Sequence, residues 1–133
     1  PVDYDGIAFL LQERIDNIFD VMRPLIQQNR LAEAKECLDQ VMQLMVDRSQ
    51  RGFRDCDGGL VNRGNMGFVT DRAVHLDTGT FQPLSKEKGI HGALLRDAER
   101  LDRLTVWLRD ECPELADYFQ QQIDQTITAY EGR

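Results

Sequence analysis

Long hydrophobic runs, basic charge and paired cysteines are all scarce in this sequence, and each scarcity excludes a class of protein. No apolar run approaches the ~20 residues that a membrane-spanning helix needs, so we expect no membrane span and no membrane partner. The 133 residues include 23 acidic and 16 basic side chains, a formal net charge of −7 at pH 7. Because an acidic surface repels phosphates, nucleic acid is not an expected partner. Arg51 and Arg54 still form a local basic spot that could meet one phosphate group.

The cysteines are few and isolated. Cys37, Cys56 and Cys112 are odd in number, far apart and outside any Cys-x-x-Cys or Cys/His pattern. That spacing predicts neither a zinc site nor a disulfide framework. It favours a reducing, cytoplasmic compartment, with secretion as an effector left open. Residues 1–6 carry no signal-peptide core and no methionine, so we expect a fragment of a longer protein or a processed product.

Apolar residues make up 41% of the chain, enough for one compact domain over residues 1–133. We expect three zones: a helical pair in 1–52, a glycine-rich loop and β-hairpin in 53–84, and helices in 85–133. In the first zone the apolar period predicts two antiparallel helices, the first over residues 5–27. The expected buried faces carry Ile7, Leu11, Ile15, Ile18, Met22 and Ile26, then Leu31, Ala34, Leu38, Val41, Met42 and Met45.

Proline, asparagine and glycine residues set the expected limits of these helices. Pro24 is expected either to kink the first helix or to start a new one. Asn29 and Arg30 form the short connection, and Gly52 is the expected stop of the second helix. Pro113 begins the last helix of the chain, since proline is well tolerated in a first helical turn.

The middle zone changes character because glycines make turns dense there. Two short apolar runs, Met66–Val69 and residues 73–76, flank Thr70-Asp71-Arg72 and predict a small antiparallel hairpin. In the third zone, a helical stripe is expected at Leu94, Ala98, Leu101, Leu104 and Leu108. The predicted fold class is therefore mainly α with a small β-hairpin, an α+β arrangement.

Residues 73–81 read AVHLDTGTF, and the Asp-Thr-Gly has two chemical interpretations. Retroviral-type aspartic proteases carry this tripeptide, but their fold is built almost wholly of strands, whereas this chain has mostly helical patterns. The residues upstream favour a magnesium site instead. Asp57 stands in the glycine-rich loop after a helix, Asn65 opens the hairpin, and Asp77 closes it with a glycine two residues on.

This order of loop Asp, Asn, hairpin and Asp-x-Gly resembles the C-terminal lobe of the protein kinase and aminoglycoside phosphotransferase superfamily. The resemblance implies that Asp57 is catalytic and orients or deprotonates an acceptor hydroxyl, and that Asn65 and Asp77 bind magnesium. Asn62 is the alternative ligand, since it stands five residues after Asp57, the family's usual gap, while Asn65 gives the better hairpin. The sequence NMGF…RAVHLDTG is similar to sequences of kinase-like bacterial proteins of the chlamydial group.

A working kinase also needs a lobe of strands with a glycine-rich loop, a phosphate-binding lysine and a glutamate that pairs with the lysine. The sequence before Phe53 has no such pattern. We therefore expect magnesium as the cofactor and ATP only when a missing nucleotide-binding lobe is supplied, so that the isolated chain is inactive. The alternative is a non-catalytic domain, pseudokinase-type or a helical module, that binds a protein partner.

Plainer interpretations apply to several of these residues. Asp55, Asp57 and Asp77 could act only as turn formers, because aspartate side chains bond to nearby backbone. A calcium loop is rejected, since Phe53 and Gly64 would then stand at ligand positions. His75 is expected to be a surface or second-layer histidine, not a catalyst, because it points to the opposite face of its strand from its neighbours.

Overall fold

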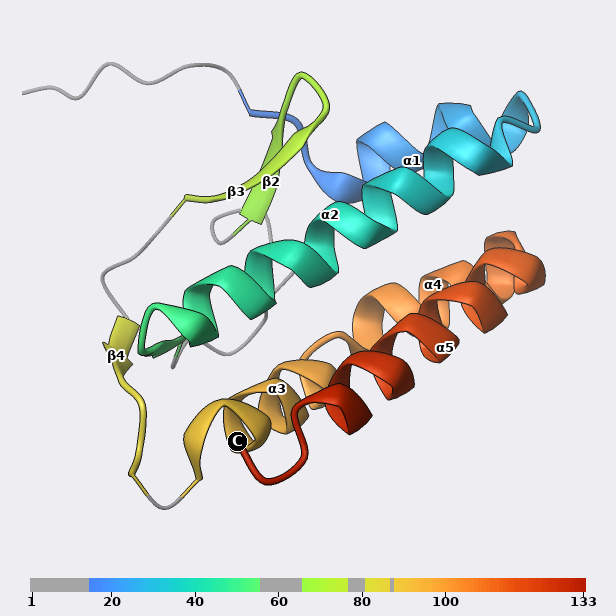
Figure 1. Ribbon diagram of the computed structural model, residues 1–133. Helices are drawn as coiled ribbons and strands as arrows, with labels where there is room; N and C mark the ends of the chain where they lie inside the picture. The colour runs from blue at the N-terminus through green and yellow to red at the C-terminus, as the bar shows by residue number, and fades with distance from the viewer. Residues whose placement is uncertain (1–14, 56–65, 77–80, 87) are drawn as a thin grey trace, which may run out of the picture.

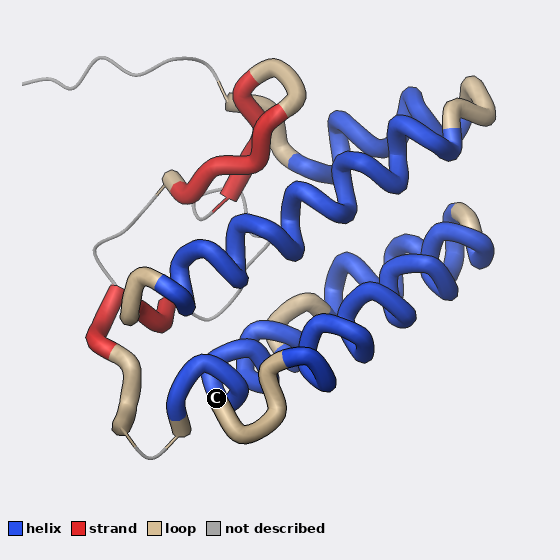
Figure 2. The backbone as a smooth tube through the Cα atoms, viewed as in Figure 1, coloured by secondary structure: helices blue, strands red, loops and turns tan. Residues whose placement is uncertain are grey.

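The computed structural model describes residues 15–55, 66–76, 81–86 and 88–133 (Figures 1 and 2). Within this part the chain forms five α-helices and two small two-stranded antiparallel sheets. The helices are α1 (Ile18–Gln27), α2 (Leu31–Gln50), α3 (Gly89–Glu99), α4 (Asp102–Glu111) and α5 (Pro113–Ala129). The strands are β1 (Phe53–Asp55), β2 (Met66–Val69), β3 (Arg72–His75) and β4 (Phe81–Pro83). The predicted mainly helical α+β class is confirmed.

Helix α1 begins later than the sequence predicts. Ile15, Asp16 and Asn17 are not helical, so the expected helix over residues 5–27 is wrong at these three positions, while residues 1–14 lie outside the described part. Asp16 pairs instead with Phe68 of β2: Asp16 N donates to Phe68 O at 2.9 Å, and Phe68 N donates to Asp16 O at 2.7 Å. Backbone pairing with the hairpin therefore replaces the helical bonds that the apolar period favours.

Local capping fixes where α1 starts and ends. The side chain of Asn17 accepts a hydrogen bond from Phe19 N at 2.9 Å, which satisfies a free donor of the first turn. Pro24 lies inside the continuous helix and does not start a new one. The chain leaves α1 through Asn29, whose φ of 55° is a conformation that asparagine tolerates well, and enters α2 after Arg30 as predicted.

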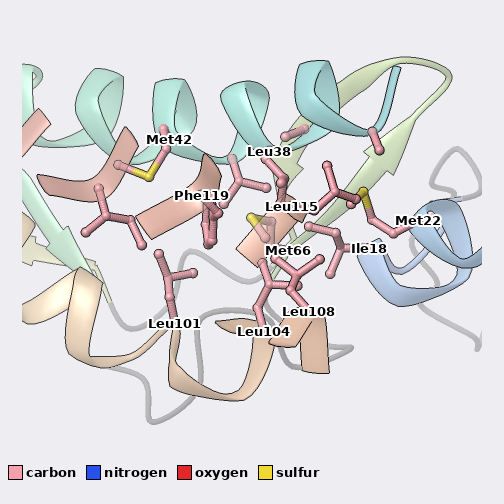
Figure 3. Packing of buried hydrophobic residues seen from close by; sticks show 14 of the residues in the cluster. Ile18, Met22, Leu38, Met42, Met66, Leu101, Leu104, Leu108, Leu115 and Phe119 are labelled. Atoms are coloured by element: carbon pink, nitrogen blue, oxygen red, sulfur yellow. The ribbon is translucent and has the colours of Figure 1, made fainter. Parts of the chain in front are cut away.

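Helix α2 runs through the middle of the fold, with the β2–β3 hairpin on one side and α3, α4 and α5 on the other (Figure 1). The buried cluster draws on every helix and on the hairpin, which makes one continuous core (Figure 3). Of the residues predicted for the face of α2, Ala34, Leu38, Val41, Met42 and Met45 are buried, and Leu31 is half-buried. The helical period therefore located this face correctly.

The predicted third-zone stripe is buried, but it spans two helices rather than one. Leu94 belongs to α3, Leu104 and Leu108 belong to α4, and all three are buried. Between the helices, Leu101 N donates to Ala98 O, a tighter i−3 bond that ends α3. Leu101 itself is fully buried, so the break keeps the leucine stripe directed toward the core.

The four strands form two nested antiparallel pairs. β2 pairs with β3, with Met66 opposite His75, which confirms the predicted hairpin with its second strand one residue earlier than expected. Thr70 has a φ of 59° in the two-residue turn. β1 pairs with β4, with Asp55 opposite Phe81, and this outer pair was not predicted from the sequence.

Changing Gly67→Ala is expected to separate β2 from the segment before α1. A Cβ at Gly67 would lie 2.2 Å from Ile15 Cγ2 and 2.9 Å from the carbonyl oxygen of Asp16. Overpacking of this kind costs about 1–3 kcal/mol, which urea denaturation would measure as a lower midpoint. Adding Ile15→Ala should recover part of the loss, because it removes the side-chain clash but leaves the clash with the carbonyl. An unchanged midpoint for Gly67→Ala would contradict this packing.

Candidate functional site

The residues predicted for catalysis and metal binding, Asp57, Asn62, Asn65 and Asp77, all lie outside the described residues. Their roles therefore stay predictions. What the structure describes is the frame around them, because segment 56–65 joins β1 to β2 and segment 77–80 follows β3 and leads into β4. Among the described residues, no group of three or more His, Cys, Asp or Glu side chains is arranged to hold a metal ion.

A cleft of about 330 Å³ lies where the C-terminal half of α2 meets the strands that border these two segments. Its lining comes from α2, the turn after it, and strands β1, β3 and β4, and consists of Leu44, Asp47, Arg48, Arg51, Phe53, His75 and Phe81. The two sheets therefore share one cleft, although they do not pair with each other. Aromatic and aliphatic side chains line it together with two arginines and one aspartate, a combination that suits a ligand with an apolar part and a charged part.

Arg48 is the most unusual residue of this cleft. Its side chain is only 2% exposed, and its Nη2 donates to Oδ2 of Asp97 on α3, which is equally buried. Arg100 Nη1 lies 3.6 Å from the other carboxylate oxygen of Asp97, so two arginines share one acidic partner. The guanidinium also lies over the ring of Phe81, with Cζ 5.8 Å from the centroid.

The remaining donors of Arg48 are unused. Its buried Nε and Nη1 have no hydrogen-bond acceptor among the described residues. Guanidinium groups carry five N–H donors, and each buried donor without a partner costs about 1–3 kcal/mol. Native proteins avoid such costs, so these donors need an acceptor, which water or a ligand in the cleft would supply.

His75 lies in the wall of the same cleft. It is half-buried, and its ring meets that of Phe81 edge to face with centroids 5.0 Å apart. This position agrees with the expected second-layer histidine. The contact also joins the end of β3 to the start of β4, so it helps to define the cleft beside residues 77–80.

The pKa values of Cys37 and Tyr118, which lie outside this cleft, are both raised. Burial raises the pKa of the Cys37 thiol, and the charges of Glu36, Glu33 and Asp71 raise it further, so Cys37 is a poor thiolate nucleophile at neutral pH. Burial also raises the pKa of Tyr118 to about 12, together with its hydrogen bond to Asp39 Oδ1 at 2.7 Å. Both groups are therefore protonated at neutral pH. Their surroundings indicate a structural role for each side chain.

Sequence reasoning missed the buried ion pair, although a signal for it exists. Arg48 stands three residues after Met45 and seven after Val41, on the buried stripe of α2. Asp97 stands three residues after Leu94, on the buried stripe of α3. Opposite charges at positions where the period expects apolar residues on two helices indicate a buried pair, since buried charges are paired.

Comparison of the chain with protein-family models, with curated proteins and with solved structures finds no match. The kinase-like resemblance therefore depends on the motif residues alone, and the chemistry of the cleft is argued from its geometry. No helix in the described residues is both long and apolar enough to cross a membrane.

Proposed function

We propose that this chain is the metal-binding half of a kinase-like phosphotransferase, arranged as the C-terminal lobe of that superfamily. Asp57 would orient the acceptor hydroxyl, and Asn65 and Asp77 would bind magnesium, with Asn62 as the alternative to Asn65. Phosphoryl transfer would require a nucleotide-binding lobe that supplies the phosphate-binding lysine. The observation that carries the proposal is the nesting of the β2–β3 hairpin within the β1–β4 pair.

The nesting supports a shared metal site through chain connectivity. Asn65 directly precedes Met66, Asp77 is two residues beyond His75, and Met66 and His75 are paired across the hairpin. Paired residues in an antiparallel ladder have Cα atoms about 4.5–5.5 Å apart. Asn65 and Asp77 stand one and two residues beyond such a pair, so chain connectivity would hold them close together, as one metal ion requires. Magnesium binds one or two protein carboxylate or amide oxygens and completes its octahedron with water and phosphate.

The outer pair supports the role of Asp57 in the same way. Asp55 pairs with Phe81, and Asp57 stands two residues after Asp55 in the sequence, while Asp77 stands four residues before Phe81. Segment 56–65, with Asp57 and Asn65, runs between the paired residues Asp55 and Met66. Segment 77–80, with Asp77, lies between their partners His75 and Phe81 in the sequence. An acceptor-orienting carboxylate must work beside the metal-bound phosphate, because phosphoryl transfer depends on positioning.

The isolated chain is expected to bind divalent metal weakly and ATP not measurably. A lone lobe leaves its metal site in bulk water, where each charge interaction is weakened, and it lacks the lysine that fixes the nucleotide phosphates. Calorimetric titration with magnesium and ATP should show no nucleotide affinity. Mn²⁺, used as a paramagnetic substitute, should broaden the amide NMR signals of Met66 and His75 before those elsewhere in the chain.

Asp77→Asn should abolish this selective broadening and leave the fold intact. Asp71→Asn is the matched control, because Asp71 is an exposed aspartate in the turn at the other end of the same hairpin. Tight ATP binding by the isolated chain would show that the boundaries of the site are wrong. Broadening that is the same in both variants would contradict a metal site at Asp77.

One surface favours the alternative, a non-catalytic domain that binds a protein partner. A cleft of about 400 Å³ between α1 and α4 contains Phe19 and Trp107, whose rings meet edge to face at 5.2 Å. Val106 beside them is 63% exposed, and Arg103 lies over Phe19. Aromatic and arginine side chains are enriched at protein interfaces. This alternative is preferred if the gene encodes no nucleotide-binding lobe and Asp77→Asn changes no metal binding.

A further inference from the structure

The cleft beside Arg48 has a donor set that neither the proposed metal site nor the fold uses. Arg48 Nε and Nη1 are buried without an acceptor among the described residues, and Arg48 forms part of the cleft wall. Its ion pair with Asp97 uses Nη2, and Arg100 competes for the same carboxylate. Among the described residues these two donors therefore lack an acceptor, and the charged, planar donors of a guanidinium suit an oxyanion.

The rest of the lining specifies what the oxyanion is attached to. Phe53 is 43% exposed, an uncommon position for a large aromatic side chain, and it lines the cleft together with Phe81 and Leu44. Arg51 is exposed at the rim and adds a second cation. Asp47 also lines the cleft, but its carboxylate already accepts from Gln43 Nε2 at 2.7 Å.

We propose that this cleft binds a small aryl oxyanion, a flat ring that carries a phosphate or a carboxylate. The oxyanion accepts hydrogen bonds from Arg48 and is held at the rim by the charge of Arg51. The ring lies against Phe53 and Leu44, where contact with apolar and aromatic side chains replaces water. The volume of about 330 Å³ is of the size that small-molecule sites occupy, about 300–1,000 Å³. The proposal requires no metal and no nucleotide, so it stands or falls separately from the phosphotransferase proposal.

NMR titration of the ¹⁵N-labelled chain tests this directly, in metal-free buffer containing a chelator. The Nε–H signal of Arg48, identified by its loss in Arg48→Lys, should shift and saturate with phenyl phosphate or with benzoate. The two probes separate a phosphate from a carboxylate as the oxyanion. Inorganic phosphate lacks the ring and benzyl alcohol lacks the charge, so each should bind at least about tenfold more weakly than the better aryl oxyanion.

Substitutions then test the assigned roles. Arg48→Lys keeps a cation for Asp97 but removes the planar donors, and should weaken binding at least about tenfold. Arg51→Gln and Phe53→Ala, both at exposed positions, should weaken binding several-fold and leave the fold unchanged. The matched controls are Arg23→Gln and Val106→Ala on the α1–α4 face, which should leave binding unchanged.

Three results would overturn the proposal. The Arg48 Nε–H signal of the folded wild-type chain could fail to move with either aryl oxyanion. Inorganic phosphate or benzyl alcohol could bind as tightly as the better aryl probe, which would remove the ring or the charge from the recognition. The control variants could weaken binding as much as Arg51→Gln and Phe53→Ala. If Arg48→Lys does not fold, the Arg48 Nε–H signal is assigned by through-bond NMR experiments on the wild-type chain, and that signal and the two rim variants decide the matter.

Discussion

Replacing Asp97 with alanine is expected to remove about 3–5 kcal/mol from the free energy of unfolding, the cost of removing the carboxylate that pairs with a buried guanidinium. Asp97 is 2% exposed and lies between Arg48, also 2% exposed, and Arg100, which is 9% exposed. The variant would keep two buried arginines and remove the carboxylate that pairs with both. A loss of this size is a large fraction of the about 5–15 kcal/mol that stabilises a typical domain.

Arg48→Met should cost less than Asp97→Ala, because Asp97 then keeps Arg100 at 3.6 Å. The matched control is Asp117→Ala. Asp117 pairs with Arg109 at 2.6 Å, but the two side chains are 74% and 54% exposed. Exposed pairs contribute about 0–1 kcal/mol, so this control should change stability little. Urea denaturation monitored by circular dichroism measures all three, and equal losses for Asp97→Ala and Asp117→Ala would contradict a structural role for the buried pair.

The helices could be predicted because each carries a long periodic signal. The stripe from Ala34 to Met45 and the stripe from Leu94 to Leu108 both follow the 3.6-residue period, and both are buried. The limits of α1 could not be predicted in the same way. The apolar residues before Ile18 continue the helical period, but the backbone of Asp16 finds partners on Phe68, far along the chain. A tertiary contact therefore overrides local preference at that point.

The hairpin could be predicted from a local sequence signal, whereas the outer strand pair depends on a long-range contact. The β2–β3 hairpin has two short, mostly apolar segments, Met66–Val69 and residues 73–76, with a local turn between them, which is a complete sequence signal. β1 and β4 have three residues each, and Arg54 pairs with Gln82, 28 positions away. Three residues are too few for a period-2 pattern, and Pro83 at the end of β4 argues against a strand in the sequence. The outer pair therefore depends on a long-range contact around the hairpin, for which the sequence carries no local signal.

The candidate functional residues also differ in whether the sequence alone could identify them. Asp57, Asn65 and Asp77 came from a motif in the sequence, which names residues but gives no distances. The cleft around Arg48 comes from packing between α2 and the strands, and its lining residues are scattered from Leu44 to Phe81. The local signal for the buried ion pair beside this cleft is a charged residue within an apolar helical stripe. That signal identifies Arg48 and Asp97 separately, whereas their pairing requires the fold.

Changing Phe119→Ala is expected to cost about 3–5 kcal/mol, the range for deleting a buried phenylalanine. Phe119 is fully buried on α5, and its ring lies in the middle of the core, between Met42 of α2 and Leu101 (Figure 3). Its removal would leave a cavity at the contact between α5 and α2, and close packing around it limits collapse. Urea denaturation should show a lower midpoint with an unchanged slope, since the surface exposed on unfolding stays nearly the same.

Two variants make this last result specific. Phe119→Leu preserves most of the volume and should lose less than Phe119→Ala, about 1.5 kcal/mol or less if the site repacks. Val106→Ala, at a position that is 63% exposed, should stay within about 0.5 kcal/mol of the wild type. Phe119 does not line the Arg48 cleft, so the folded Phe119→Ala chain should still bind the aryl oxyanion with unchanged affinity. A loss of binding in that folded variant, or a cost for Phe119→Ala as small as that for Val106→Ala, would contradict the division between the core and the cleft.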